Sequence, residues 1–210
     1  MKKFLLVIIA IVGISSGAVF GYRLTHADAM HETKTQVLST ENQQKEDKPT
    51  EYPQEVVNAQ PGIPVNISIP KINVNTTIES VGMDSKGRMD VPKDADNTAW
   101  FRLGYRPGTN GSAVIDGHYD KASGAPAVFW DLDKLEDGDQ IIVTDDAGNK
   151  WTFVVNRTTK YPYDQFPLKE VFGASDVPKL NLITCHGEWN DNTKNYAERM
   201  VIYSTLQSEK

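Results

Sequence analysis

The chain has one cysteine among its 210 residues, Cys185, so no intramolecular disulfide can form. Outside the cytosol a lone thiol is exposed to oxidation and mispairing, and exported chains ordinarily have two or more cysteines or none. Retaining one indicates that the sulfur is itself used, most simply as a nucleophile. The alternative is a small hydrophobic residue in a core strand, because free cysteine is among the most buried residue types. Position alone leaves both open.

The chain also lacks an excess of basic residues, with 22 lysines and arginines against 28 aspartates and glutamates. Residues 1–24 hold three of the basic residues and no acidic one, so residues 25–210 carry 19 basic and 28 acidic residues, a net charge of −9. An acidic surface argues against nucleic acid as a partner, and against adhesion to anionic lipid or polyanionic wall polymers. It suits a catalyst that stays mobile near such polymers.

Long hydrophobic runs are absent except at the N-terminus. Lys2 and Lys3 precede an apolar run over residues 4–20 that is interrupted only by small residues. The run lies at the low end of the ~17–25 residues of spanning helices. A signal peptide cleaved after Ala27-Asp28-Ala29 is the alternative, but the run is long for a signal sequence, and the two lysines fit an anchor with its N-terminus inside. We therefore expect a membrane anchor over residues 1–24.

Residues 25–60 differ from both neighbouring segments in composition. Charged and amide side chains dominate there with almost no apolar periodicity, so the segment cannot bury enough surface to offset its ordering entropy. We expect a flexible polar linker, and a coil of ~36 residues has an r.m.s. reach of about 30–35 Å. His26 and His31 lie in this linker, where they are poor candidates for metal ligands. Residues 61–207 then have a suitable length for one domain with its own core.

The domain over residues 61–207 is predicted to be mostly β. Strands are predicted from period-two alternation and β-rich runs over residues 65–69, 112–116, 140–144, 151–156, 180–184 and 200–206. Turn sequences separate several of them, at residues 84–88, 107–111 and 145–149. One short helix is expected over residues 127–135. Many short strands at turn-marked intervals indicate a sandwich or a barrel.

Cys185 ends the apolar run LNLITC, and Arg199 begins the next predicted strand. Residues 186–197 between them are polar and are expected to form a loop. If the two strands are neighbours, Cys185 and Arg199 lie at the two feet of that loop, because adjacent strands are only ~5 Å apart. Alternation puts Arg199 on the same face as Val201 and Tyr203, at the rim of an apolar surface. A surface ion pair of Arg199 is the alternative.

A third reactive side chain, His118, follows the predicted strand in GSAVIDGHYD. Catalytic residues tend to collect at strand ends and in loops. His186 competes with it as the partner of the thiol, but neighbours on a strand point to opposite faces, so adjacency to Cys185 argues against His186. His118 is therefore the better candidate, with Asp116 and Asp120 nearby in sequence to modulate its charge.

A cysteine, a histidine and an arginine at strand ends can perform acyl transfer. The thiolate attacks a peptide carbonyl, and the histidine serves as acid or base for the leaving amine and the incoming nucleophile. The guanidinium donates hydrogen bonds to the developing oxyanion or holds the substrate backbone. We predict His118, Cys185 and Arg199 as the catalytic set, with Thr184 and its backbone as substrate-binding donors.

Several segments accompany these residues in a specific order. His118 comes 67 residues before Cys185 in LNLITC, and Arg199 in ERMVIYS follows 14 residues later. The domain opens with NISIPKINVNTTIESVG and has AVFWDLDKLEDGDQIIV in its middle. The whole resembles the sortase transpeptidase family, with its opening Ile-Pro-Lys-Ile and its Phe-x-x-Leu-x-x-Leu-x-x-Gly-Asp segments. The stretch AWFRLGYRPGTNGSAVIDGHYD is most similar to class F, with class D or E as alternatives, and His186 departs from the small residue common after the cysteine.

The resemblance implies an all-β fold, a closed eight-stranded sortase-type β-barrel with short helices, preceded by the N-terminal membrane segment. It implies cleavage of a Leu-Pro-x-Thr-Gly-like sorting signal between Thr and Gly, and transfer of the acyl group to a cell-wall amine. The implied partners are surface proteins that bear sorting signals and the amine of a peptidoglycan precursor. The implied location is the cell membrane, with a single-pass anchor and an extracellular catalytic domain. Some relatives bind calcium through acidic loops, but a solvated turn explains Asp145 and Asp146, so neither metal nor cofactor is expected.

Two other classes are weighed against this resemblance. L,D-transpeptidases usually have His-Gly-Cys where this chain has Thr-Cys-His-Gly, and papain-like peptidases have the cysteine before the histidine. A tethered cysteine peptidase and a non-catalytic wall-binding module with Cys185 in its core stay open as alternatives. Alkylation distinguishes them, because a buried structural thiol resists it in the folded state and a nucleophile in a groove does not.

Overall fold

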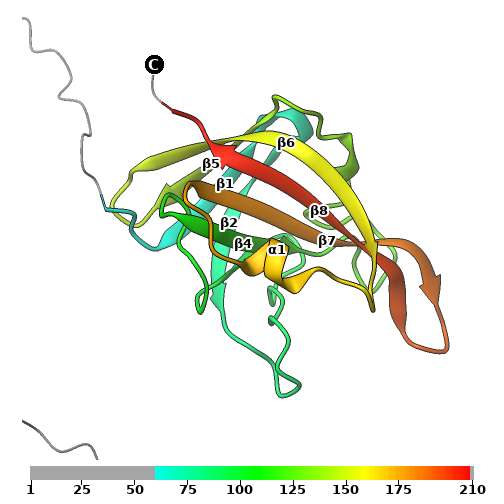
Figure 1. Ribbon diagram of the computed structural model, residues 1–210. Helices are drawn as coiled ribbons and strands as arrows, with labels where there is room; N and C mark the ends of the chain where they lie inside the picture. Colours follow the sequence, from blue (N-terminus) through cyan, green and yellow to red (C-terminus); the bar gives the residue numbers. More distant parts are fainter. Residues whose placement is uncertain (1–59, 209–210) are drawn as a thin grey trace, which may run out of the picture. The chain divides into compact units, whose positions relative to one another are not determined.

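The computed structural model describes residues 60–208, which form a closed barrel of eight strands (Figure 1). Around the barrel the strands follow the order β1-β2-β3-β4-β7-β8-β6-β5. The pairs β2–β3 and β4–β7 are parallel, and the other neighbours are antiparallel. The elements are β1 (Pro64–Ile69), η1 (Pro70–Ile72), β2 (Val74–Val81), β3 (Thr98–Phe101), β4 (Gly111–Gly117), η2 (Leu132–Lys134), β5 (Gln140–Asp145), β6 (Lys150–Pro162), α1 (Leu168–Phe172), β7 (Pro178–Asn190) and β8 (Asn195–Leu206). The predicted closed eight-stranded barrel is confirmed.

Alternate residues of the strands fill the barrel interior. Side chains alternate between the two faces of a strand, so every second residue points inward. Ile67 and Ile69 of β1, Phe153 of β6, and Leu180 and Leu182 of β7 are fully buried in this core. The residues between them on β7 point outward, which decides where the reactive side chains lie.

A second apolar cluster covers the outside of the barrel over β4, β7 and β8. Its buried members are Val114, Val171, Ile183, Val201 and Tyr203. Val171 belongs to the short helix α1, which lies next to β4 and β7 in Figure 1. The amide Nδ2 of Asn181 donates a hydrogen bond of 2.6 Å to the carbonyl oxygen of Val171, so β7 holds the helix in place. The helix α1 therefore covers part of this outer surface of the barrel.

β7 and β8 are longer than the sequence predicted. They stay paired up to Asn190 and Asn195, and they project beyond the barrel as a hairpin (Figure 1). The polar loop expected over residues 186–197 is therefore wrong. Trp189 and Tyr196 lie opposite each other across this hairpin, with ring centroids 5.2 Å apart. Cross-strand aromatic contacts of this kind stabilise strand pairing, and they hold the otherwise polar segment in register.

The helix predicted over residues 127–135 is wrong, because the backbone there forms turns and only the 3-10 turn η2. The N–H of Ala127 donates to the carbonyl oxygen of Tyr119 at 3.1 Å, and the N–H of Phe129 donates to that of His118 at 3.0 Å. Phe129 is fully buried in the barrel core. These tertiary contacts hold the segment along the chain that follows β4, and they outweigh its local preference for helix.

The membrane anchor predicted over residues 1–24, and nearly all of the linker predicted over residues 25–60, lie outside the described residues. Within residues 60–208, no helix has the length and apolar character needed to cross a membrane. Anchor and linker stay predictions.

Asp145 holds the β5–β6 hairpin together, which corrects the expectation of a solvated turn. Its buried side chain accepts hydrogen bonds from the backbone of Gly62 (3.0 Å) and Asn149 (2.9 Å), and from the indole of Trp151 (3.1 Å). Burial raises the pKa of Asp145, but these donors outweigh burial and lower the pKa to about 2. The neighbouring Asp146 is exposed.

We expect Asp145→Asn to lower the free energy of unfolding by about 1–2 kcal/mol at pH 7. A lowered folded-state pKa stabilises the protein above the unfolded value of ~4, and this contribution is lost as the pH falls through about 2. Urea unfolding of the parent and of Asp145→Asn at pH 7 and at pH 3 measures this contribution. The difference in the free energy of unfolding between the two proteins should be smaller at pH 3. The exposed Asp137→Asn is the control, within ~0.5 kcal/mol of the parent. A gap that does not change with pH would contradict the assignment.

Candidate active site

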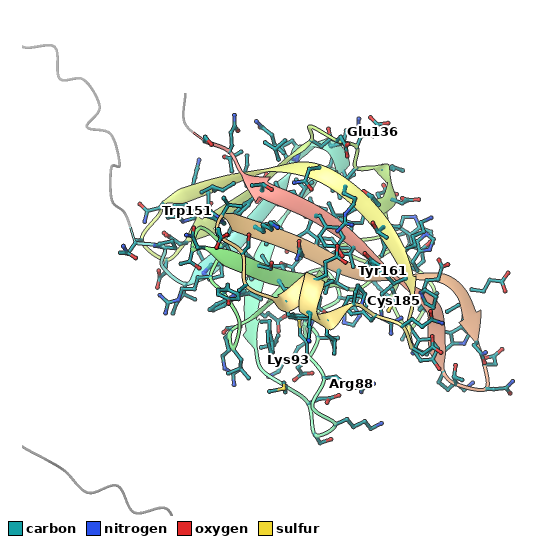
Figure 2. The ribbon with its side chains drawn as sticks, in the orientation of Figure 1. Arg88, Lys93, Glu136, Trp151, Tyr161 and Cys185 are labelled. Carbon is teal, nitrogen blue, oxygen red and sulfur yellow. The ribbon has the colours of Figure 1, made fainter. Side chains whose placement is uncertain are left out.

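The outer face of β4, β7 and β8 opens into a cavity of about 700 Å³ that His118, Cys185 and Arg199 all line. Strand register explains their convergence. Cys185 pairs with Arg199, and the last β4–β7 pair is Asp116 with Ile183, two residues before His118 and Cys185 respectively. Figure 2 labels Cys185 on β7, near α1. The structure therefore brings the three predicted residues to one place.

Cys185 is half-buried and faces the cavity, whereas its β7 neighbour Leu182 faces the barrel core. Burial raises the pKa of the Cys185 thiol, the charge of Arg199 lowers it, and Asp116 and Asp120 raise it further. The net effect is a raised pKa, so the resting form is the neutral thiol. A nucleophilic role then requires a base that removes the proton as the sulfur attacks.

His118 is positioned by the segment between β2 and β3. Its Nε2 lies 3.0 Å from the carbonyl oxygen of Pro92. A carbonyl only accepts hydrogen bonds, so Nε2 carries the hydrogen in this contact and Nδ1 is the nitrogen left to take a proton. Sequence inspection could not find this partner, because every residue has a main-chain carbonyl and only the fold selects one.

His186 is held away from the cavity. Its Nδ1 lies 3.0 Å from Glu198 Oε2, across the β7–β8 hairpin, and its ring is near that of Tyr119. It does not line the cavity that holds Cys185. The alternation argument therefore describes its placement correctly: Cys185 and His186 are adjacent in sequence but point to different sides of β7.

Arg199 is held by its own hairpin. Its Nη2 donates to Asn195 Oδ1 at 2.7 Å, and its Nη1 donates to the carbonyl oxygen of Glu198 at 2.9 Å. Within the described part of the chain, no carboxylate lies within ion-pair distance of this guanidinium. The surface ion pair considered as an alternative is therefore absent from residues 60–208, and the charge is directed at the cavity.

Thr184 has a structural contact. Its hydroxyl is buried and donates a 2.8 Å hydrogen bond to the carbonyl oxygen of Gly117, the last residue of β4. That bond ties β7 to the end of β4, directly between Cys185 and His118. Thr184 also lines the cavity, and its role in binding substrate stays a prediction.

The carboxylates expected to modulate His118 have other neighbours. Among the described residues, neither Asp116 nor Asp120 forms a hydrogen bond with His118. Asp120 Oδ2 accepts a 2.6 Å hydrogen bond from the hydroxyl of Tyr196. Burial and this contact with Asp120 raise the pKa of Tyr196 to about 12. Both carboxylates act instead on the Cys185 thiol, by raising its pKa.

Apolar side chains from two connecting segments and from the end of β3 wall the cavity: Met83, Met89, Val91, Phe101, Phe166 and Phe172. Phe166 and Phe172 come from the connection between β6 and β7, which contains α1. The contribution of residues 82–91 was not predicted, because only a turn was recognised there. Figure 2 labels Arg88 on this segment and Lys93 just after it, in the connection between β2 and β3 that projects from the barrel.

The Sortase domain family model matches residues 67–207. The chain belongs to the sortase family. The predicted family is thereby confirmed, and the match covers residues 67–69 of β1, the other seven strands and the three cavity residues named above. No protein with curated function matches the chain.

Solved sortase structures share the fold. Sortase A from Corynebacterium diphtheriae has a TM-score of 0.54 and 19% identity over 72% of this chain and 64% of that one. Sortase C1 from Streptococcus agalactiae has a TM-score of 0.54 and 21% identity, over 70% and 68% of the two chains. A Clostridium perfringens Sortase D5 transpeptidase has a TM-score of 0.52 and 23% identity, over 70% and 79%. This sortase thus spans less than two thirds of the Corynebacterium chain, and the likeness establishes the fold.

We expect Arg199→Lys to reduce turnover of an accepted peptide by at least ~100-fold, the scale of losing one oxyanion donor. Lysine keeps the charge but loses the planar fork of donors, one arm of which Asn195 orients. The measurement is kcat/KM for peptide cleavage, with the exposed Arg106→Lys as a matched control. Near-parental rates for Arg199→Lys would mean that charge alone matters at this position.

Proposed function

We propose that this sortase is a membrane-anchored cysteine transpeptidase that cleaves a Leu-Pro-x-Thr-Gly-like sorting signal between Thr and Gly. The acyl group then passes to the amine of a cell-wall precursor. The observation that supports the proposal most is the convergence of His118, Cys185 and Arg199 in one apolar-walled cavity on the outside of the barrel. An extended peptide needs an open groove of this kind, and acyl transfer needs these three side-chain types.

The proposed reaction has two halves. Cys185 passes its proton to His118, and the sulfur attacks the carbonyl carbon of Thr. Arg199 donates hydrogen bonds to the carbonyl oxygen, which becomes negative. The Thr–Gly C–N bond breaks, His118 returns the proton to the departing glycine amine, and a thioester joins Cys185 to the threonine. An incoming amine then attacks that thioester, gives a proton to His118, and displaces the sulfur, which is protonated again.

We also propose the context of the reaction from the sequence. The apolar run over residues 4–20 is the single-pass anchor in the cell membrane, and residues 25–60 tether an extracellular catalytic domain. Surface proteins with sorting signals are the acyl donors, and a peptidoglycan precursor is the amine acceptor. Class F is the proposed subgroup, from the stretch around residues 99–120, with class D or E as the alternatives.

The test measures how the thioacyl enzyme partitions between water and amines. We expect a Leu-Pro-x-Thr-Gly peptide to yield mainly the amine adduct when hydroxylamine, oligoglycine or a diamino acid is added, because the half-buried thioester must wait for an acceptor. Mass spectrometry of the products with rising amine concentration gives the ratio. A product that stays the free acid, at a rate no amine changes, would indicate a tethered cysteine peptidase. No cleavage of any sorting peptide, together with a Cys185 that resists alkylation, would indicate a non-catalytic module.

A further inference from the structure

Asp116 is a carboxyl group in the cavity that the proposed reaction does not use. It lies on the outward face of β4, opposite Ile183 and two residues before His118, and it lines the same cavity as Cys185. Its Oδ1 is buried and has no hydrogen-bond partner among the described residues. Burial raises the pKa of Asp116 well above its usual value, and the charges of Asp90 and Glu79 add to that effect.

The Asp116 carboxyl neither stabilises the fold nor favours the thiolate form of Cys185. A buried polar atom without a partner destabilises the folded state, and an apolar residue would match its outward neighbours Val114 and Ile183 better. Its charge also raises the pKa of the Cys185 thiol, which opposes formation of the thiolate. His118 has its hydrogen bond with Pro92 instead. The remaining use of the group is a contact with whatever enters the cavity.

Among the described residues, no side chain donates a hydrogen bond to Oδ1 of Asp116. Neither arginine that lines the cavity bonds to Asp116: Arg88 donates to Asp84 Oδ2 at 2.7 and 2.9 Å, and Arg199 donates to Asn195 and to its own hairpin backbone. Asp90, exposed at the cavity, adds a second negative charge. The site around Asp116 is therefore complementary to an N–H donor brought in by a ligand.

We propose that Asp116 is a specificity-determining residue that receives an N–H-donating side chain, basic or amide, from the sorting peptide. This deepens the proposed function and rests on it. The donor bonds a partly buried carboxyl whose Oδ1 has no partner among the described residues, whereas an apolar side chain at the same place makes no hydrogen bond with it. Discrimination of this sort is large, because a site built for a hydrogen bond rejects the analogue that lacks it.

The experiment uses the full chain and sorting peptides in which each position outside the cleaved Thr–Gly pair is Lys, Arg, Gln, Asn, Leu or Ala. We expect the parent to prefer an N–H donor over Leu at one position by at least ~10-fold in kcat/KM. Asp116→Ala should remove that preference and raise the rate with Leu. Asp116→Asn distinguishes a basic donor from an amide donor. It should abolish a preference for Lys or Arg, but retain a preference for Gln or Asn.

Two further variants and a melting curve complete the test. Asp164→Ala, exposed and outside the cavity, should leave the preference unchanged. Asp90→Ala removes a charge from the same cavity, and an equal loss of preference there would overturn the assignment to Asp116. If Asp116→Ala does not melt cooperatively, the nearly isosteric Asp116→Asn tests the proposal alone. It should then lose a preference for Lys or Arg, or cleave a peptide with Gln or Asn more slowly than the parent does. No donor preference in the parent, or a preference unchanged in Asp116→Ala, overturns the proposal. Where Asp116→Asn decides alone, an unchanged preference for Lys or Arg, or an unchanged rate with the amide, overturns it. If the parent cleaves no peptide, the proposed function itself is contradicted. This result differs from a parent that cleaves peptides without a donor preference, which contradicts only the role of Asp116.

Discussion

Cys185→Ala should lose at least ~10⁴-fold of peptide turnover, because removing a nucleophile costs more than removing any group that assists it. The fold should survive. Cys185 is half-buried at the cavity, and the core packing of β7 comes from Leu180 and Leu182 on the other face of the strand. Turnover by chromatography and a thermal melt on the same preparation measure both effects, and the melting temperature should change by no more than a few degrees.

Trapping provides the positive control for this prediction. The parent chain should accumulate a peptide adduct at Cys185 when the amine is withheld, and iodoacetamide should block it, whereas Cys185→Ala should form none. Alkylation of the parent should also be slower near neutral pH than that of a free thiol, because burial and the two nearby carboxylates raise the thiol pKa. More than trace turnover by Cys185→Ala would end the assignment of the nucleophile. A variant that unfolds would support the structural role considered at the start.

The barrel portions of the strands that frame the site could be predicted because they are apolar runs bounded by polar or turn residues, whereas the full lengths of β7 and β8 could not. The pairing of Cys185 with Arg199 follows from two consecutive apolar runs that become antiparallel neighbours. Alternation then separates Cys185 from His186 without any structural information. These are local properties, and the closed barrel preserves them.

The parts that sequence inspection missed depend on distant contacts. Residues 186–197 are polar and resemble a loop, yet the Trp189–Tyr196 contact and the hydrogen bond from Tyr196 to Asp120 keep them paired as a hairpin. The wall from residues 82–91 and the contact between His118 and Pro92 depend on where the β2–β3 connection folds back. The sequence indicated Asp116 only as a modulator of His118, because the burial of an aspartate near the end of a strand cannot be read from the sequence.

The two histidines provide the second large effect. His118→Ala should lower turnover by about 10³-fold, within the ~10²–10⁴ range of general acid–base catalysis, because the neutral thiol of Cys185 then has no base and the leaving amine no acid. His186→Ala removes the same type of side chain one residue from the nucleophile, but its ring contacts Glu198 and lies outside the cavity. It should therefore keep turnover within about threefold of the parent.

The pair is informative because the two variants differ in position and not in chemistry. Separate measurement of kcat and KM for both variants should show the His118 effect in kcat, because the ring transfers protons in the chemical step and does not set peptide affinity. A melting curve for each variant excludes a general loss of structure. The opposite ranking, with His186→Ala nearly inactive and His118→Ala active, would mean that β7 turns its side chains differently around Cys185, and that the base reaches the sulfur from the hairpin side instead of from the end of β4.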